Sequence, residues 1–158
     1  MLVSSCLLGE GVRYDGKIKR ADMVLQKLQE RGEIVLVCPE VAGGLSVPRP
    51  PSEIILGDGA DILDGKGRII NRIGEDVTDA FVRGAHDALQ LCRQFDIKVA
   101  ILKARSPSCS KEMIYDGTFT GTLKPGKGVT AALLEREGIE IFDEAQIESA
   151  LVKAGIRF

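Results

Sequence analysis

Residues 34–39 read Ile34-Val35-Leu36-Val37-Cys38-Pro39, and this stretch decides the fold class. It is a continuous apolar run rich in β-branched residues, which is typical of a parallel strand buried on both faces. Two other short runs have the same character, namely Leu2-Val3-Ser4-Ser5, which ends at Cys6, and Val99-Ala100-Ile101-Leu102. We therefore expect at least three strands of one parallel sheet.

Segments with helical periodicity separate these strands. A helix is predicted over 18–31, with one apolar stripe made of Ala21, Val24, Leu25 and Leu28. Gly32 is suited to the left-handed backbone conformation that often follows the C-terminus of a helix. A second helix is predicted from Thr78, as its cap, to Phe95, with one apolar face. That face carries Phe81, Ala85, Ala88, Cys92 and Phe95.

The C-terminal part predicts a helix at 129–137, a strand at 139–142 and a last helix at 144–154. Such alternation predicts an α/β fold, with a mainly parallel sheet covered by helices. Residues 1–158 are expected to form a single domain. It contains a Pro- and Gly-rich excursion at about 39–76, in which 62–63 and 69–70 are predicted to pair around the turn at 64–67.

Composition excludes several classes of protein. The 158 residues are 44% hydrophobic and 28% charged with a net charge of −2, so disordered, collagenous and coiled-coil classes are excluded. The charge balance argues against a dedicated duplex nucleic-acid binder.

No apolar stretch approaches the roughly 18 residues of a membrane span, and the first residues lack a signal peptide. We expect a cytoplasmic protein with reduced thiols.

Three of the four cysteines follow predicted strands, namely Cys6, Cys38 and Cys109. Because parallel strands end at one edge of the sheet, we expect these thiols to lie together in the crevice where ligands of such sheets bind. They could be structural cysteines, ligands of a metal or cluster, or redox thiols. A closed zinc site would want a fourth ligand, and a four-iron cluster held by three thiolates would leave one iron without cysteine. Cys92 is predicted to be core packing.

Other polar residues are expected at the same edge. Glu40 could be a general base or acid, or a solvated loop carboxylate. Ser106 and Ser108 could cap backbone amides or donate hydrogen bonds to a ligand, and Lys103 could hold an anion, as could Arg105. We assign Ser108 and Lys103 to substrate binding.

Two further features give weak signals. The single histidine, His86, is expected to be structural or solvated, which leaves acid–base work to other groups. Residues 126–130 (Gly-Lys-Gly-Val-Thr) look like a phosphate-binding helix entry, but the full Walker A pattern is missing. A nucleotide-binding α/β domain that uses this turn is therefore one rival interpretation.

Three blocks of sequence carry a resemblance. The first is Cys6-Leu7-Leu8-Gly9 with residues 12–16 (Val-Arg-Tyr-Asp-Gly). The second is Cys38-Pro39-Glu40 with residues 43–45, 48–51 and Glu53. The third is Ser106-Pro107-Ser108-Cys109 with residues 102–103, 114–119 and 128–131. Together, in this order and over essentially the whole chain, they resemble the bacterial thiouracil desulfurase family.

The resemblance implies a Rossmann-like three-layer sandwich that carries a 4Fe-4S cluster. It implies that the cluster ligands are Cys6, Cys38 and Cys109, and that the remaining open iron binds the sulfur of a thiolated pyrimidine. Glu40 would activate water or move protons, and Ser106 would hold the substrate or assist proton transfer. The product would be the oxo-pyrimidine, with sulfide released and no net redox change.

The sequence departs from the family pattern at Ser110, where the pattern has glycine after the third cysteine; this changes loop geometry but removes no ligand. Some relatives carry an additional C-terminal domain, and the end of this chain at Phe158 leads us to expect a free base or nucleoside as substrate. The rival from another class is a non-catalytic iron–sulfur or zinc binding module, or a sulfur carrier.

Overall fold

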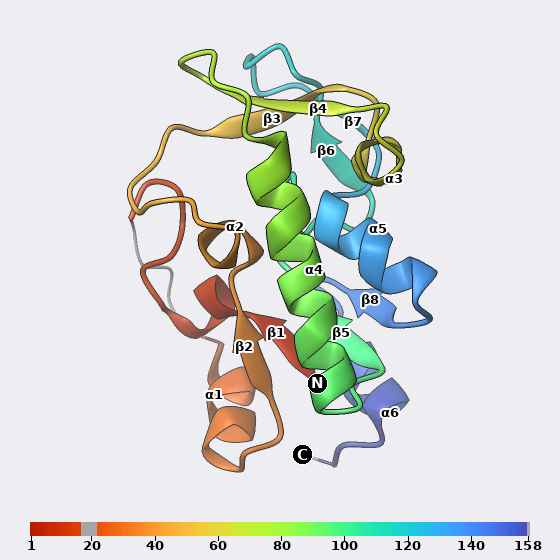
Figure 1. Cartoon of the computed structure of the whole chain (residues 1–158). Coiled ribbons are helices and arrows are strands. Elements are labelled where there is room, and N and C mark those ends of the chain that lie inside the picture. Colours follow the sequence, from red (N-terminus) through yellow and green to blue (C-terminus); the bar gives the residue numbers. More distant parts are fainter. Residues whose placement is uncertain (17–21, 158) are drawn as a thin grey trace.

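The computed structural model describes residues 1–16 and 22–157, and within them a four-stranded parallel sheet forms the centre of the molecule (Figure 1). Its strands, in spatial order, are β2 (Val35–Val37), β1 (Leu2–Ser4), β5 (Val99–Ile101) and β8 (Glu140–Phe142). Leu2 is in register with Val35 on one side and with Ala100 on the other. The chain thus passes from β1 to β2 and later crosses to the opposite side of β1. This makes β1 the point where the strand order changes direction, the place where open α/β sheets bind ligands.

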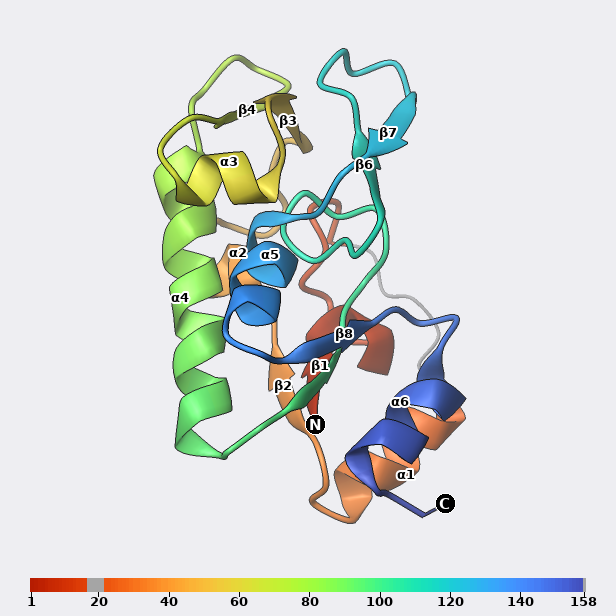
Figure 2. The same ribbon diagram turned by 90° about the vertical axis from the view of Figure 1, so that its right-hand side faces the viewer.

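Helices cover both faces of this sheet, as Figure 2 shows. One face packs against α4 (Thr78–Gln94) and α5 (Val129–Arg136), and the other against α1 (Met23–Glu30) and α6 (Ile147–Ala154). Successive strand residues point to opposite faces, so Leu2 joins the first core and Val3 the second. The predicted α/β fold with a parallel sheet flanked by helices is confirmed.

The excursion at 39–76 is more ordered than its composition indicates. It contains α2 (Pro39–Ala42), β3 (Ser52–Leu56), α3 (Gly59–Leu63) and β4 (Arg68–Asn71). The predicted pairing of 62–63 with 69–70 is wrong, because 62–63 lie in α3 and β4 pairs antiparallel with β3. The reason is a local capping box. The Asp58 carboxylate accepts hydrogen bonds from the N–H groups of Ala60 and Asp61, and the Asp61 carboxylate accepts one from Asp58 N–H.

The ends of α4 also differ from the prediction. Thr78 is the first helical residue and not the cap; its N–H donates to the Asp76 carboxylate at 3.0 Å and its hydroxyl lies 2.6 Å from the same oxygen. Phe95 follows the last helical residue and is 54% exposed, because the helical periodicity no longer holds there. The other four residues of the predicted face are buried, Cys92 among them.

The first and last helices are shorter than predicted. Asp22 caps α1, its carboxylate accepting from the N–H groups of Val24 and Leu25, and Gly32 follows the helix with the expected positive φ of 72°. Residues 17–21, where the helix was predicted to begin and where Ala21 lies, fall outside the described residues. The last helix begins at Ile147 and not at 144.

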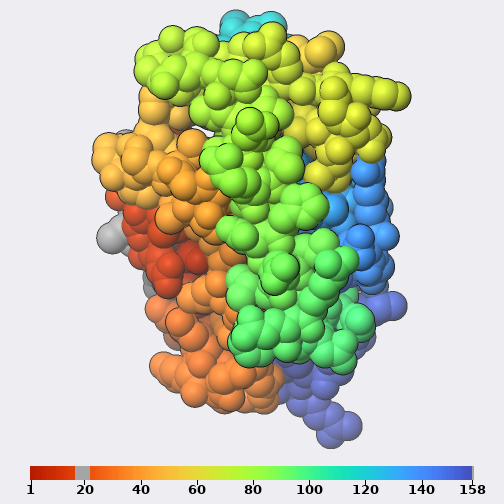
Figure 3. All heavy atoms as spheres, in the orientation of Figure 1, coloured from red at the N-terminus to blue at the C-terminus, as the bar shows by residue number. Residues whose placement is uncertain are grey.

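Two glycines bring α2 and α4 into direct backbone contact. A Cβ on Gly43 would lie 1.9 Å from the Ala80 carbonyl oxygen, and one on Gly84 would lie 1.8 Å from the Pro39 carbonyl oxygen. Arg83 adds two hydrogen bonds to the Gly43 carbonyl, at 3.3 and 3.1 Å. In the space-filling view α4 runs down the middle of this face with the α2 segment against it (Figure 3). This contact fixes α2 relative to the sheet.

No helix in the described part of the chain is both long enough and apolar enough to cross a membrane.

Candidate active site

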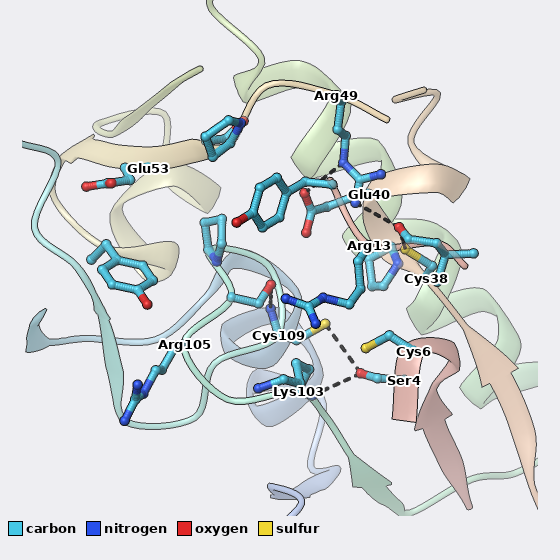
Figure 4. A pocket seen from close by; sticks show the side chains of 18 of the residues that line it. Ser4, Cys6, Arg13, Cys38, Glu40, Arg49, Glu53, Lys103, Arg105 and Cys109 are labelled. Atoms are coloured by element: carbon cyan, nitrogen blue, oxygen red, sulfur yellow. Dashed lines mark hydrogen bonds and ion pairs between the residues drawn. The ribbon is translucent and has the colours of Figure 1, made fainter. Parts of the chain in front are cut away.

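A pocket of about 510 Å³ lies where β1, β2 and β5 end (Figure 4). Six of the seven predicted site residues line it. They are Cys6, Cys38, Glu40, Lys103, Ser106 and Cys109.

The three cysteines reach the pocket from three different segments. Cys6 lies in the 3-10 helix η1 (Ser5–Leu8) that directly follows β1, and Cys38 occupies the N-cap position of α2 directly after β2. Cys109 lies in the loop after β5 and is almost fully buried. Figure 4 shows the sulfurs of Cys6 and Cys109 both close to Ser4, with Cys38 beside Arg13. The sheet thus gathers thiols that are far apart in the sequence.

Hydrogen bonds hold two of these thiols. Ser4 Oγ lies 3.6 Å from Cys109 Sγ and also accepts a hydrogen bond from Lys103 N–H at 3.0 Å. The Cys38 thiol lies 3.8 Å from the Val12 carbonyl oxygen. Ser4 therefore links the ends of β1 and β5 to the most deeply buried of the three pocket cysteines.

The electrostatics of the pocket oppose free thiolates. Burial, with a smaller contribution from the neighbouring Cys38, raises the pKa of the Cys6 thiol to about 11. Burial likewise raises the pKa of Cys109 to about 12, with repulsion from Cys6 and Cys38 acting in the same direction. Because the thiols raise one another's pKa, three thiolates at this place need a compensating positive charge, which metal ions supply.

This donor set is chemically suited to an iron–sulfur group. Thiolates are soft ligands that suit zinc, copper(I) or iron–sulfur clusters. Within residues 1–16 and 22–157, no three Cys, His, Asp or Glu side chains converge closely enough to hold one ion. In a cluster each cysteine binds a different iron atom. The three sulfurs therefore need to lie around a cluster of several atoms and do not need to converge on one ion.

The loop that carries Cys109 is anchored to the start of α5. The N–H groups of Val129 and Thr130 donate to the carbonyls of Pro107 and Ser108, at 2.9 and 2.8 Å, and Gly128 N–H donates to Ser110 O at 2.9 Å. These amides are therefore engaged within the protein. Lys127, the cation within residues 126–130, is paired with Glu135. Residues 126–130 thus position the cysteine loop and do not offer a phosphate site.

Ser106 and Ser108 have different surroundings although they are two residues apart. Ser108 is fully buried, its hydroxyl lies 2.7 Å from Thr130 Oγ1, and it is not among the pocket-lining residues. The structure therefore does not bring this predicted substrate ligand to the pocket. Ser110 is also buried, and its hydroxyl donates to the Met113 carbonyl.

Glu40 lies in the first turn of α2 and faces the pocket next to Arg49. Arg49 Nε lies 3.3 Å from Glu40 Oε1, and the Arg49 side chain is only 5% exposed. Arg49 also donates to the Val12 and Ser46 carbonyls, both at 3.0 Å. Burial raises the pKa of the Glu40 carboxyl, whereas Arg49 and a hydrogen bond from Ser106 act in the opposite direction. The carboxylate is thus held in a fixed orientation.

The hydrogen bonds of Ser106 determine where its proton points. Ser106 Oγ accepts from the N–H groups of Ser108 and Cys109, both at 3.1 Å. A hydroxyl has two acceptor sites and one proton, so with both acceptor sites in use the proton is left for Glu40. The same serine therefore shapes the Cys109 loop and lowers the pKa of the Glu40 carboxyl.

Lys103 lines the pocket, but its ammonium group is engaged. Lys103 Nζ lies 2.8 Å from Glu144 Oε1 and 3.2 Å from the Ala104 carbonyl oxygen. Arg105, the other cation we expected at this edge, also lines the pocket.

Sequence reasoning missed several lining residues. Arg49 was part of a recognised block but had no role; a single charged residue within Pro48-Arg49-Pro50-Pro51 was the available signal. The aromatic side chains of Tyr14, Tyr115 and Phe119 also line the pocket, as do Arg13, Arg72 and Glu53. Only the fold shows that these residues share one cavity.

Comparisons with known proteins identify the family of this chain. The model of the 2-thiouracil desulfurase family matches residues 1–146. The uncharacterized protein YbbK of Bacillus subtilis (strain 168) is 42% identical over 151 residues, which is 96% of this chain and 99% of YbbK. The solved structure of the [4Fe-4S]-dependent thiouracil desulfidase TudS is 42% identical, with a TM-score of 0.87, and the similarity covers 98% of this chain and 97% of TudS. The chain therefore belongs to the 2-thiouracil desulfurase family.

Proposed function

We propose that the protein is a 4Fe-4S-dependent desulfurase that converts the C=S group of a thiolated pyrimidine to C=O and releases sulfide. The observation that carries this proposal is the presence of three thiols, Glu40 and Ser106 in one pocket of a chain from the thiouracil desulfurase family. The cluster dependence of the similar TudS structure supports the same cofactor here.

In this proposal Cys6, Cys38 and Cys109 hold the cluster. When bound, the cluster would supply an iron without a cysteine ligand, a Lewis acid that takes the soft sulfur of the substrate and withdraws electron density from its carbon. The basic side chains that line the pocket offset the negative charge of three thiolates. Cys92 is buried in the α4 core and takes no part.

Glu40 acts as the base. It removes a proton from a water molecule, whose oxygen forms the new C–O bond while the C–S bond breaks. The carboxylate then returns this proton to the departing sulfur, and the remaining O–H proton is released as the carbonyl forms. Thiocarbonyl plus water thus becomes carbonyl plus hydrosulfide and one proton, with no oxidant or reductant. Arg49 holds Glu40 in place, and Ser106 donates to it during this exchange.

The pocket suits a small substrate. Its volume of about 510 Å³ lies within the range of about 300–1,000 Å³ that is usual for small-molecule sites. Aromatic and proline side chains line part of it, as expected around a planar ring. We therefore propose a thiolated pyrimidine base or nucleoside as substrate. We place the reaction in a reducing compartment such as the cytoplasm, where thiols stay available for cluster assembly.

The test is turnover by anaerobically prepared protein. Iron and acid-labile sulfide are measured after reconstitution, and the loss of thiouracil absorbance is compared with the sulfide released. We expect one sulfide per thiouracil consumed. The Glu40→Gln variant should keep its iron and lose turnover, whereas Glu135→Gln, which changes an exposed carboxylate far from the pocket, should behave like the wild type. Iron binding without thiouracil consumption would instead identify a non-catalytic metal-binding or sulfur-carrier module.

A further inference from the structure

The outer part of the pocket is formed by a hairpin loop with unusual backbone geometry. The loop joins β6 (Met113–Tyr115) to β7 (Leu123–Pro125), and its residue Phe119 lines the pocket. Phe119 has a φ of 58°, in the left-handed region. Bulky side chains rarely adopt this conformation, and where they do the surrounding structure must enforce it.

Three contacts enforce it here. Glu53, a buried residue of β3, accepts hydrogen bonds through Oε1 from the N–H groups of Gly117 and Phe119, at 3.0 and 3.2 Å. Arg72 Nη2 lies 3.5 Å from the Phe119 carbonyl oxygen, so the residue is held on both sides. Gly117 packs so tightly on β3 that an added Cβ would lie 2.8 Å from the Ile54 carbonyl oxygen.

The fold itself has no need of phenylalanine at this position. Glycine is the residue that adopts a positive φ most readily, and the loop already uses it at 117 and 121. Phe119 is half-buried and belongs to neither hydrophobic core. Phe119 thus combines a strained backbone with a partly exposed ring at the edge of the pocket. Binding of a ligand in the pocket explains this combination more simply than a requirement of the fold does.

We propose that Phe119 is a substrate-binding residue whose ring packs against the flat face of the thiolated pyrimidine, and that Glu53 is the positioning residue that holds it there. Tyr115, which ends β6 and lines the same pocket, extends this aromatic wall. Aromatic side chains bind bases through their π-faces, so the wall orients the ring without contacting the reacting carbon. This inference rests on the proposed function for the identity of the ligand.

The decisive variant is Phe119→Gly, because it separates binding from folding. Glycine relieves the strained backbone, so the thermal unfolding midpoint should stay the same or rise. Loss of the ring should raise KM for thiouracil about tenfold or more, a change equivalent to about 1.4 kcal/mol, with kcat within about threefold and iron content unchanged. Phe95→Ala, which removes an exposed aromatic ring outside the pocket, is the matched control and should leave KM unchanged.

Glu53 is tested by two replacements. Glu53→Gln keeps a side-chain oxygen that can accept both loop N–H groups, whereas Glu53→Ala keeps none. We expect KM to rise for Glu53→Ala as it does for Phe119→Gly, and Glu53→Gln to recover most of the affinity. Equal KM values for both replacements and the wild type would remove Glu53 from this role.

Binding of uracil to the holoenzyme, measured by calorimetry, separates this inference from the proposed function. If the wild type binds uracil and Phe119→Gly weakens that binding, the aromatic wall stands even if the wild type does not turn over thiouracil. An unchanged uracil affinity in Phe119→Gly, or a wild type that binds no pyrimidine, would overturn it.

Discussion

Gly84→Ala is a conservative substitution in α4, an element that carries none of the three pocket cysteines, and we expect it to disable the site. Gly84 lies in α4 where the α2 backbone touches it, and a Cβ there would lie 1.8 Å from the Pro39 carbonyl oxygen and 2.6 Å from the Pro39 carbonyl carbon. Pro39 stands between Cys38 and Glu40. Any movement of Pro39 therefore carries a cysteine and the proposed base with it.

The magnitude follows from the geometry. Restoring ordinary contact at 3.4 Å requires α2 to move by about 1.6 Å. Alanine in a helix interior is favoured over glycine by about 1 kcal/mol, but overpacking against a backbone group costs up to about 3 kcal/mol. We expect a net loss of about 2 kcal/mol in the free energy of unfolding, which lowers the melting temperature by roughly 4–8 °C for a chain of this length.

The catalytic effect should be larger than the effect on stability. A misplacement of about 1 Å can reduce a rate about 10²-fold, so we expect kcat with thiouracil to fall by at least that factor. Thermal unfolding, iron content and steady-state turnover are measured on the same preparation. Gln90→Ala, an exposed change on the same helix, is the control and should be neutral in all three measurements.

Helix propensity alone makes the opposite prediction. If the close α2–α4 contact were unimportant, Gly84→Ala would stabilise α4 and leave turnover unchanged. A melting temperature equal to or above that of the wild type, together with normal kcat, would refute the reasoning that this contact positions Cys38 and Glu40.

Three further predictions concern the site itself. Alanine at any of the three pocket cysteines should abolish the visible absorbance and stoichiometric iron of the reconstituted cluster, whereas Cys92→Ala should retain both; a full cluster in Cys109→Ala would remove that residue as a ligand. Ser106→Ala leaves two loop N–H groups without their acceptor and Glu40 without its hydroxyl donor, so kcat should fall about 10²-fold at nearly unchanged iron content, and wild-type kcat would contradict its role. Arg49→Lys keeps the charge but cannot make the forked contacts to Glu40, Val12 and Ser46, so kcat should fall about tenfold in steady-state assays; an unaltered kcat would show that charge alone suffices.

Local patterns were enough to locate the strands. The apolar runs at 2–5, 34–37 and 99–102 contain the three strands β1, β2 and β5, and they predicted a parallel sheet because burial on both faces leaves no polar alternation. Patterns were insufficient in the excursion, where 62–63 were read as a strand. The capping box at Asp58 and Asp61 stabilises a helix turn there, and this local polar signal outweighs two apolar residues.

Contacts between distant residues could not be read from the chain. The pairing of Arg49 with Glu40 depends on how the excursion folds back over α2. The engagement of the Gly126–Thr130 amides depends on where the Cys109 loop lies relative to α5. In both cases the partners lie on separate segments, and only the packed structure sets their distance and orientation.

The two serines before Cys109 show most clearly which features the sequence determines and which are set only by the tertiary structure. The order of strands and cysteines along the chain already required Cys6, Cys38 and Cys109 to meet at one edge of a parallel sheet, since parallel strands end on the same side. The same order does not distinguish Ser106 from Ser108, although the family resemblance implies a role for Ser106 and we assigned Ser108 to substrate binding. The tertiary structure separates them, because the N–H groups of Thr130 and Ala131 bind the Ser108 carbonyl and the Thr130 hydroxyl pairs with its side chain, while Ser106 is left facing Glu40.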